Sequence, residues 1–314
     1  MKWILLATIV VLAGCDKFTS NKPVRIAINP WPGYEFLYLA KQKNIFEQFD
    51  LNIELVEMAS LADVQRIYVQ GRVDGMTSTV IELVHAAGQT EDPISIVLIP
   101  DYSNGGDVIV AHKSVQSIPD LKGKQVTAEL GSLGMYVLYE ALNKAGMELK
   151  DVQLDNSEQL EIESLLTNRK IDAAVTYPPA STLVLRNPDF HKIFDSSQIP
   201  ESIIDIVAVK ASVIKNDPEW VNKFHQAWGA VLEYARTHPE ESYAIMAERE
   251  GTTANEFQQA LEGLILLDKN EQERILSDGK IEKNVKAVCQ VLLQSNAISF
   301  PCENALSKIK VWNP

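Results

Sequence analysis

The sequence of 314 residues predicts an α/β protein with two lobes, mostly parallel sheets and a helical C-terminal tail. Strand-like and helix-like segments alternate over residues 24–112, and the same alternation begins again near residue 124. After Asn216 the remaining segments are helical only. Alternation of this kind is typical of parallel sheets, because parallel strands need a crossover connection between them.

The first group of elements begins with a short apolar strand at residues 24–29. Residues 35–46 place their apolar side chains on one broad helical face, and residues 51–55 alternate as a half-buried strand does. Ser60 and Asp63 resemble a capping box for a helix that ends at Gly71. Further strands are expected over residues 73–77, 94–100 and 107–112, with a helix near residues 80–87.

The second group repeats this order. Ser132 is expected to cap a helix that reaches Gly146, and Ser157 a second helix that ends before Lys170. Pro178 and Pro179 end a strand, because proline cannot continue a sheet. The expected strands are 124–129, 152–154, 171–176, 193–195 and 203–209, with a helix over 180–187. The tail helices are expected over 218–237, 239–250, 253–267 and 280–295.

These groups predict that the chain leaves a first lobe near residue 112 and returns to it near residue 204. The first lobe would then hold residues 23–111 and 205–314, and the second lobe residues 112–204. Ligands bind preferentially between domains and beyond the carboxyl ends of parallel strands. The candidate site therefore lies where strand ends of the two lobes meet.

Polar, glycine and aromatic residues follow the expected strands. Glycines and hydroxyls at helix starts leave backbone N–H groups free for carboxylate or sulfonate oxygens, and aromatic rings can wall an apolar ligand body. The alternative for the serines and threonines is ordinary helix capping without a ligand. The candidate ligand-binding residues are Trp31, Gly33, Tyr34, Ser60, Thr77, Ser78, Thr79, Asp101, Ser103, Gly131, Ser132, Tyr177 and Asp205. Replacing Trp31 with alanine is expected to weaken ligand binding with little loss of stability.

The N-terminus has the pattern of a signal peptide over residues 1–14. Its apolar run of eleven residues is too short for a membrane span, which needs roughly 20 residues. The tetrapeptide Leu12-Ala13-Gly14-Cys15 resembles the bacterial lipobox, which implies lipid attachment at Cys15. Residues 15–22 would then be a tether, and the protein would be anchored by lipid to the periplasmic side of a cell-envelope membrane. The alternative is an ordinary signal peptide with a chance cysteine.

Composition and charge restrict the partners. A formal net charge of −13 argues against binding to nucleic acid or to anionic lipid. The other two cysteines, Cys289 and Cys302, are thirteen residues apart in a chain that the signal directs to an oxidising compartment. We expect a disulfide worth about 3 kcal/mol by loop closure, the alternative being two reduced thiols.

Seven segments in register carry a pattern that is weak in each one alone. The segments are Trp31–Ala40 with Asn44-Ile45-Phe46, Gly71–Asp74, Ser103–Asp107, Ile118–Lys124, Glu129–Ser132, Lys170–Ala174 and Phe194–Ser197. Together they resemble the nitrate, sulfonate and taurine family of ABC-transporter substrate-binding proteins. The resemblance covers almost all of residues 23–235 and implies the type II periplasmic-binding-protein fold, a small-molecule ligand for import and an ABC permease as partner. Family members bind sulfonates, nitrate, bicarbonate and pyrimidine-like rings, and the resemblance does not choose among them.

Enzyme motifs are missing from the sequence, which has no nucleophile elbow, P-loop or zinc-protease pattern. The five histidines lack the spacing of metal ligands, and we expect no cofactor, no catalysis and a monomer. The acids near the strand ends favour a neutral or amine-bearing ligand over a strong anion. The alternative function is a sensory binding protein that presents its liganded state to a membrane receptor. The histidines are His85, His112, His191, His225 and His238.

Overall fold

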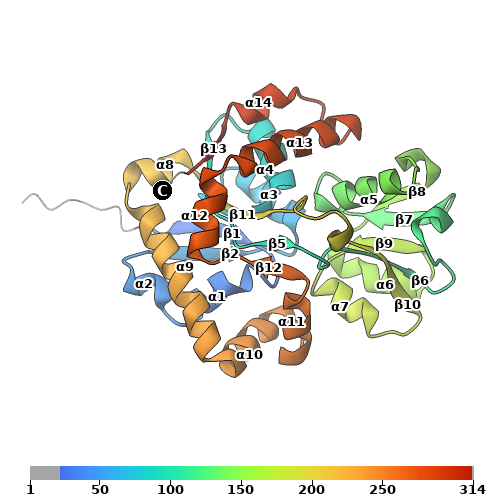
Figure 1. The fold of residues 1–314 in the computed structure, drawn as a ribbon, viewed down its shortest axis with the longest axis horizontal. Helices are drawn as coiled ribbons and strands as arrows, with labels where there is room; N and C mark the ends of the chain where they lie inside the picture. The colour runs from blue at the N-terminus through green and yellow to red at the C-terminus, as the bar shows by residue number, and fades with distance from the viewer. Residues whose placement is uncertain (1–21, 313–314) are drawn as a thin grey trace, which may run out of the picture.

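The computed structural model describes residues 22–312 and shows two lobes side by side (Figure 1). The predicted signal peptide, Cys15 and all of the tether except Lys22 lie outside the described residues. Over residues 22–312, no helix combines the length and apolar character that a membrane crossing requires. The α/β fold with a helical C-terminal region confirms the predicted fold class.

The first lobe is the part of the protein built on a six-stranded sheet. Its strands, in spatial order, are β13 (Ile309–Val311), β4 (Ile94–Leu98), β11 (Asp205–Lys210), β3 (Gly75–Thr79), β1 (Val24–Ile28) and β2 (Ile53–Glu57). Only β11 runs antiparallel to its neighbours, β3 and β4. Strands β3 and β4 are buried along their whole length, which explains their continuous apolar or small-residue sequences.

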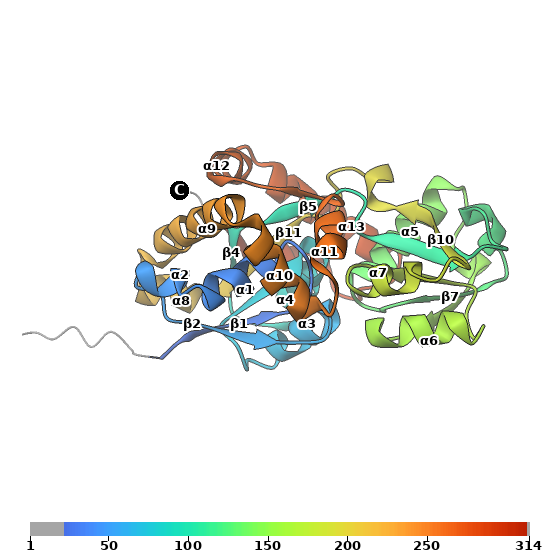
Figure 2. The same cartoon turned by 90° about the horizontal axis from the view of Figure 1, so that it is seen from below.

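Helices from both ends of the chain cover this sheet (Figures 1 and 2). Helix α9 packs on α1 and α2, where Trp228 lies 5.9 Å from Phe36 between ring centroids. The helices of this lobe are α1 (Glu35–Gln42), α2 (Ile45–Gln48), α3 (Leu61–Val69), α4 (Val80–Gln89), α8 (Ala211–Asn216), α9 (Trp220–Thr237), α10 (Pro239–Glu250), α11 (Ala254–Leu261), α12 (Lys269–Ser277), α13 (Lys280–Gln294) and α14 (Cys302–Leu306).

One predicted helix of the tail is too long. Helix α11 ends at Leu261, and residues 264–266 form strand β12 (Leu264–Leu266), which pairs with β5 (Asp101–Ser103). The cause is Gly263, whose carbonyl accepts hydrogen bonds from Asn104 N at 2.8 Å and Gly106 N at 3.0 Å. A Cβ on Gly263 would lie 2.8 Å from Gly106 N, so only glycine allows this approach without a shift. The tail is thereby attached to the crossover between the lobes.

The second lobe is built on a five-stranded sheet in which only β6 is reversed. Its strands, in spatial order, are β10 (Phe190–Asp195), β6 (Val108–His112), β9 (Ala173–Thr176), β7 (Gln125–Ala128) and β8 (Gln153–Asn156). Its helices are α5 (Leu133–Lys144), α6 (Ile162–Thr167) and α7 (Ala180–Leu185), with short 3₁₀ turns η1 (Ile118–Leu121), η2 (Leu149–Asp151), η3 (Gln159–Glu161) and η4 (Ser196–Gln198).

Two details of this lobe differ from the sequence prediction. Strand β6 pairs within the second sheet, although the predicted boundary at residue 111 assigns it to the first lobe. The lobe boundaries themselves stay a prediction. Ser157 does not cap a helix, because its hydroxyl accepts a hydrogen bond from Thr127 Oγ1 at 2.7 Å, and α6 begins only at Ile162.

Two crossover segments connect the lobes and bond to each other. The outgoing segment follows β5, and the returning segment includes η4. Ser103 Oγ lies 2.7 Å from Ser196 Oγ, and Gly105 N donates to Ser196 Oγ at 2.6 Å. Strand β6 follows the outgoing segment, and strand β11 follows the returning segment. Each crossover therefore leads into the strand that runs antiparallel to its neighbours in its sheet.

The predicted disulfide is present in the structure. Cys289 on α13 and Cys302 at the start of α14 are bonded, with their Cα atoms 5.9 Å apart and both side chains buried. Both helices pack on α4. The bond therefore fixes the C-terminal helices over the helix that follows β3.

Replacing both cysteines with alanine should lower the free energy of unfolding by about 3 kcal/mol, because the thirteen-residue separation then no longer restricts the unfolded chain. Urea unfolding of the purified protein measures this change. Adding a thiol reductant should shift the wild-type midpoint toward that of the variant and leave the variant unchanged. A variant as stable as the oxidised wild type would contradict the prediction.

Candidate functional site

A small cavity lies where the two lobes meet. Leu133 and Tyr177 belong to the second lobe, and the other lining residues come from the first lobe and the outgoing crossover. The cavity has a volume of about 10 Å³, enough for about one water molecule. The lobes are therefore closed on each other in this structure. The lining residues are Asn29, Trp31, Tyr34, Leu61, Asp107, Leu133, Tyr177 and Asp205.

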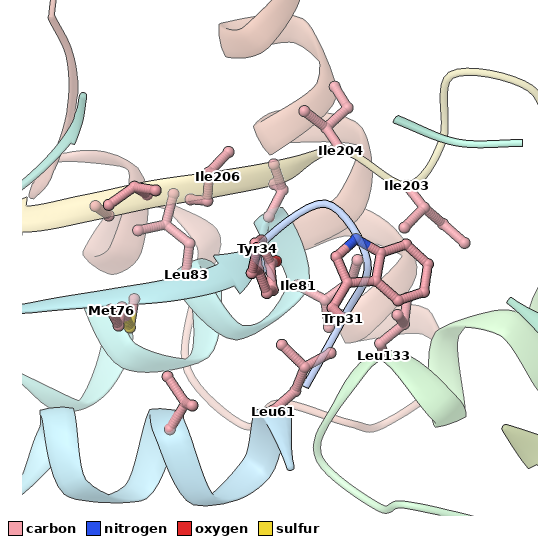
Figure 3. Packing of buried hydrophobic residues seen from close by; sticks show 14 of the residues in the cluster. Trp31, Tyr34, Leu61, Met76, Ile81, Leu83, Leu133, Ile203, Ile204 and Ile206 are labelled. Carbon is pink, nitrogen blue, oxygen red and sulfur yellow. The ribbon is translucent and has the colours of Figure 1, made fainter. Parts of the chain in front are cut away.

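Trp31 joins the two lobes at this cavity. It follows β1, is only 4% exposed, and lies among Leu61, Leu133 and Ile203 (Figure 3). Its ring meets that of Tyr177 edge-on with centroids 6.0 Å apart. Aromatic contacts of this kind add to the apolar burial of both rings. Trp31 thus contributes to lobe closure as well as to the cavity wall.

Gly33, in the loop after β1, packs against Asp101 next to the site. A Cβ at this position would lie 1.8 Å from Asp101 Oδ2. The other carboxylate oxygen of Asp101 accepts a hydrogen bond from Trp31 Nε1 at 3.3 Å. Glycine therefore allows the loop after β1 to pack directly against the carboxyl group of Asp101.

The carboxylate of Glu82, on α4 of the first lobe, accepts hydrogen bonds from the start of helix α5 in the second lobe. Its Oε2 caps its own helix, accepting from Thr79 N at 3.0 Å and Thr79 Oγ1 at 2.5 Å. Its Oε1 accepts from Ser132 Oγ at 2.6 Å and Leu133 N at 2.7 Å. Ser132 was expected to cap α5 and to leave donors free for a ligand. In the closed structure these donors are bonded to Glu82 instead.

Most of the other predicted hydroxyls are also bonded within the protein. Ser60 caps α3 by accepting from Asp63 N at 3.3 Å, and Thr77 Oγ1 donates to Ala27 O at 3.4 Å. Among the described residues, Ser78 Oγ is buried without a hydrogen-bond partner. Gly131 has a left-handed φ of 74° before α5. None of these four residues lines the cavity.

Four of the buried carboxyl groups near the cavity have a raised pKa. Burial raises the pKa of Asp101, Asp107 and Glu129 to about 7 in each case. The pKa of Asp205 lies well above its usual range, mainly because of burial and then because of the nearby Asp101 charge. Asp101 and Asp205 lie close enough for each to affect the pKa of the other. Asp205 Oδ1 also accepts from Tyr34 OH at 2.5 Å.

These raised pKa values predict that the ligand-free protein loses stability as pH rises from about 4 to about 7. In that window the folded state binds more protons than the unfolded state, so the free energy of unfolding falls with increasing pH. Two kinds of group act in the opposite direction: carboxyls with a lowered pKa, such as Glu256 at about 2, do so only up to about pH 5.5, and the buried His85, whose pKa is lowered to about 4, does so up to about pH 7. Between pH 5 and 7 the raised carboxyls outnumber them. Melting temperatures at pH 5, 6 and 7 test this.

Two variants test whether a buried carboxyl causes this pH dependence of the melting temperature: Asp107→Asn and, as its matched control, Asp92→Asn. Asp92 is exposed, whereas Asp107 is 1% exposed. Asp107→Asn should flatten the pH dependence, and Asp92→Asn should leave it as in the wild type. A melting temperature that rises from pH 5 to 7 in all three proteins would contradict the assignment.

An ion pair closes the opposite side of the lobe junction. Arg186, which follows α7, donates to both carboxylate oxygens of Glu256 on α11, at 2.7 and 2.8 Å. The pair borders a groove of about 510 Å³ between α7, α11 and the crossover. The groove holds none of the candidate residues. The ion pair, the Glu82 contact and the Trp31–Tyr177 contact all connect the lobes.

The structure thus brings together four of the predicted ligand-binding residues at one cavity: Trp31, Tyr34, Tyr177 and Asp205. The other four lining residues, Asn29, Leu61, Asp107 and Leu133, are not among the residues predicted from the sequence. Asp107 ends the crossover segment that resembles the family, but that position also fits a purely structural role. Within the described part of the chain, no cluster of histidine, cysteine or acidic side chains is arranged to hold a metal ion.

Comparisons with known proteins agree with this architecture. Residues 31–242 match the family described as NMT1/THI5 like. A relative from Brucella abortus (strain 2308), described as a candidate binding protein, is 28% identical over 152 residues, which are 45% of this chain and 46% of that protein. A candidate thiamine biosynthesis protein from Haemophilus influenzae is 26% identical over 144 residues, 46% of each chain. The matching segments thus span about half the length of these curated relatives.

Solved structures resemble the whole fold at low sequence identity. The alkanesulfonate-binding protein SsuA from Xanthomonas axonopodis pv. citri, bound to MOPS, has a TM-score of 0.77 at 13% identity and covers 93% of this chain and 99% of its own. The periplasmic nitrate-binding protein NrtA from Synechocystis PCC 6803 has a TM-score of 0.72 at 12% identity, covering 92% and 86%. The predicted periplasmic-binding-protein fold is therefore confirmed.

Proposed function

The chain belongs to the NMT1/THI5-like family, and from this premise we propose that it is a solute-binding protein that captures a small molecule between its lobes. The observation that carries the proposal is the cavity at the lobe junction, with aromatic and polar side chains from both lobes in its wall. A ligand that contacts both lobes binds the closed form more tightly than the open form. It therefore shifts the equilibrium toward closure.

We propose that closure presents the ligand to an ABC permease for import. The curated Brucella relative is described as a candidate binding protein, and structures of the same fold bind an alkanesulfonate or nitrate. Lipid on Cys15 would hold the protein at the periplasmic side of a membrane, with residues 15–22 as the tether. The ligand classes that the family resemblance suggests are sulfonates, nitrate and pyrimidine-like rings.

The cavity wall supports binding rather than covalent chemistry. Its eight residues include no serine, cysteine, histidine or lysine. Its aspartates and tyrosines are residue types that serve as nucleophiles in some enzymes, but their enclosure between two lobes fits a ligand held by closure. We therefore propose no catalytic step.

Mass spectrometry of the purified protein tests the proposed function. Under native conditions the protein should carry a small molecule, or should bind one from a metabolite extract, and its melting temperature should rise with ligand concentration. The Trp31→Ala variant should retain less of that molecule than wild type. A protein that neither carries nor takes up any small molecule would contradict the function.

A further inference from the structure

Building on the proposed function, we propose that the ligand is an organic cation, with an ammonium or amidinium nitrogen on an apolar or aromatic body. The carboxylates of Asp107 and Asp205 hold that nitrogen in the cavity between the lobes. The rings of Trp31, Tyr34 and Tyr177 enclose it.

Asp107 supplies the first observation. Its side chain is 1% exposed and lines the cavity, and neither of its carboxylate oxygens accepts a hydrogen bond within the described residues. The neighbouring Ser103 hydroxyl lowers the pKa of Asp107 but already contacts Ser196 Oγ and accepts from the Asp107 backbone N–H. Buried polar groups in folded proteins almost always have partners. A donor from a ligand would supply the missing partner.

Asp205 faces the same cavity from strand β11. It is 2% exposed, and its Oδ1 is bonded to Tyr34, whereas its Oδ2 accepts no hydrogen bond from any residue that the structure describes. Among the described residues, the charged neighbours that affect Asp205 most are Asp101 and Asp107, and both are acidic. In the ligand-free protein Asp205 avoids the cost of a buried charge by holding a proton, and the cation of a ligand would take the place of that proton.

The place where an anion would bind is already filled. The N-terminus of α5 has its Leu133 N–H and its Ser132 hydroxyl bonded to Glu82. A sulfonate or nitrate would have to displace this carboxylate and would lie beside the other acids. Negative charges that lie close together in a buried site repel each other strongly. The closed structure therefore disfavours an anionic ligand.

The aromatic residues fit the same ligand class. The faces of tryptophan and tyrosine rings attract ammonium and guanidinium groups. The closed cavity of about 10 Å³ has room for a group of the size of one water molecule, which is the size of an ammonium head. A larger ligand body would need the lobes to close less far. The described acids are not arranged as a metal site, so the cation is organic.

The first test separates a metabolite extract into fractions retained by cation exchange, retained by anion exchange, and retained by neither. Each fraction is added to the full-length mature protein, and the melting temperature is measured. The cation-exchange fraction should give the largest increase. A largest increase from the anionic or the neutral fraction would overturn this inference and leave the proposed function standing. No increase from any fraction would overturn both.

The second test uses the molecule purified from the active fraction. It measures the binding affinity and the number of protons that are released or taken up on binding. Calorimetry at pH 6.5 in buffers of different ionisation enthalpy should show proton release on binding, because a cation favours the ionised carboxyls. An anion would cause proton uptake and overturn the inference. The titratable groups that face the site are Tyr34 from the loop before α1, Glu82 from α4, Asp101 from β5, Asp107 from the crossover, Glu129 after β7, Tyr177 after β9 and Asp205 from β11.

Two isosteric variants complete the test. Asp107→Asn and Asp205→Asn should each weaken binding by about 30-fold or more, as expected when one partner of a buried charge pair is lost. Asp92→Asn, on an exposed residue, should bind as wild type. Because asparagine keeps the shape of aspartate, circular dichroism checks that each variant is folded. Folded variants that bind as tightly as wild type would remove these carboxylates from the site.

Discussion

Replacing Arg249 with methionine is expected to lower the free energy of unfolding by about 3–5 kcal/mol. The Arg249 side chain on α10 is only 4% exposed and forms an ion pair with the fully buried Glu35 at the start of α1. Burial raises the pKa of Glu35 to about 8 even though Arg249 opposes the shift. Without the guanidinium, the carboxyls of Glu35 and Glu250 would both remain buried without a cation.

The control for this experiment is Arg236→Met. Arg236 pairs with Glu233 on the exposed side of α9, where the two side chains are 71% and 59% exposed. Exposed pairs contribute little, so this change should cost less than about 1 kcal/mol. Urea unfolding of both variants gives the comparison. Equal stability of the two variants would contradict the role of the buried pair, which anchors α1 and thus the loop carrying Trp31 and Tyr34.

Replacing Trp31 with alanine is expected to weaken ligand binding by about 100-fold and also to destabilise the protein by about 3 kcal/mol or more. Its position after a strand predicts little loss of stability, but Trp31 is 4% exposed and packs against residues of both lobes. Its removal therefore opens a cavity at the lobe junction. Calorimetry and urea unfolding measure the two effects separately.

Trp228→Ala distinguishes a binding role from a general loss of stability. Trp228 is 2% exposed, contacts Phe36 and donates to Leu267 O at 3.2 Å, all within the first lobe. This variant should lose comparable stability and retain wild-type affinity. If both tryptophan variants lose affinity equally, or if Trp31→Ala binds normally, Trp31 is not part of the ligand site.

Local patterns were sufficient to predict most elements of the fold. Residues 239–250 form α10 with the expected bounds, since Pro239 starts the helix and Gly251, with a left-handed φ of 67°, follows it. What local patterns cannot show is pairing between distant segments. Strand β12 was read as helix because its partner β5 lies far away in the sequence, and the short β13 was not predicted for the same reason.

The candidate site was predictable in part. Trp31, Tyr34 and Tyr177 follow strands whose ends meet, so the rule for parallel sheets found them. The role of Glu82 was not predictable, because its position in the sequence is that of a capping residue of α4. Its second carboxylate oxygen accepts a hydrogen bond from the start of α5, a helix fifty residues later. Asp107 lay in a segment that also fits a purely structural role, and only its burial without partners reveals it as a candidate ligand contact.

The distance between the lobes tests the central claim most directly. Spin labels on cysteines introduced at Glu163 of α6 and Glu240 of α10, both exposed, report this distance in the protein with Cys15→Ser. Saturating amounts of the fraction that raises the melting temperature most should shorten the distance and narrow its distribution. The Trp31→Ala protein should respond less to the same addition. A wild-type distance that does not change at saturation would contradict capture of the ligand by closure of the lobes.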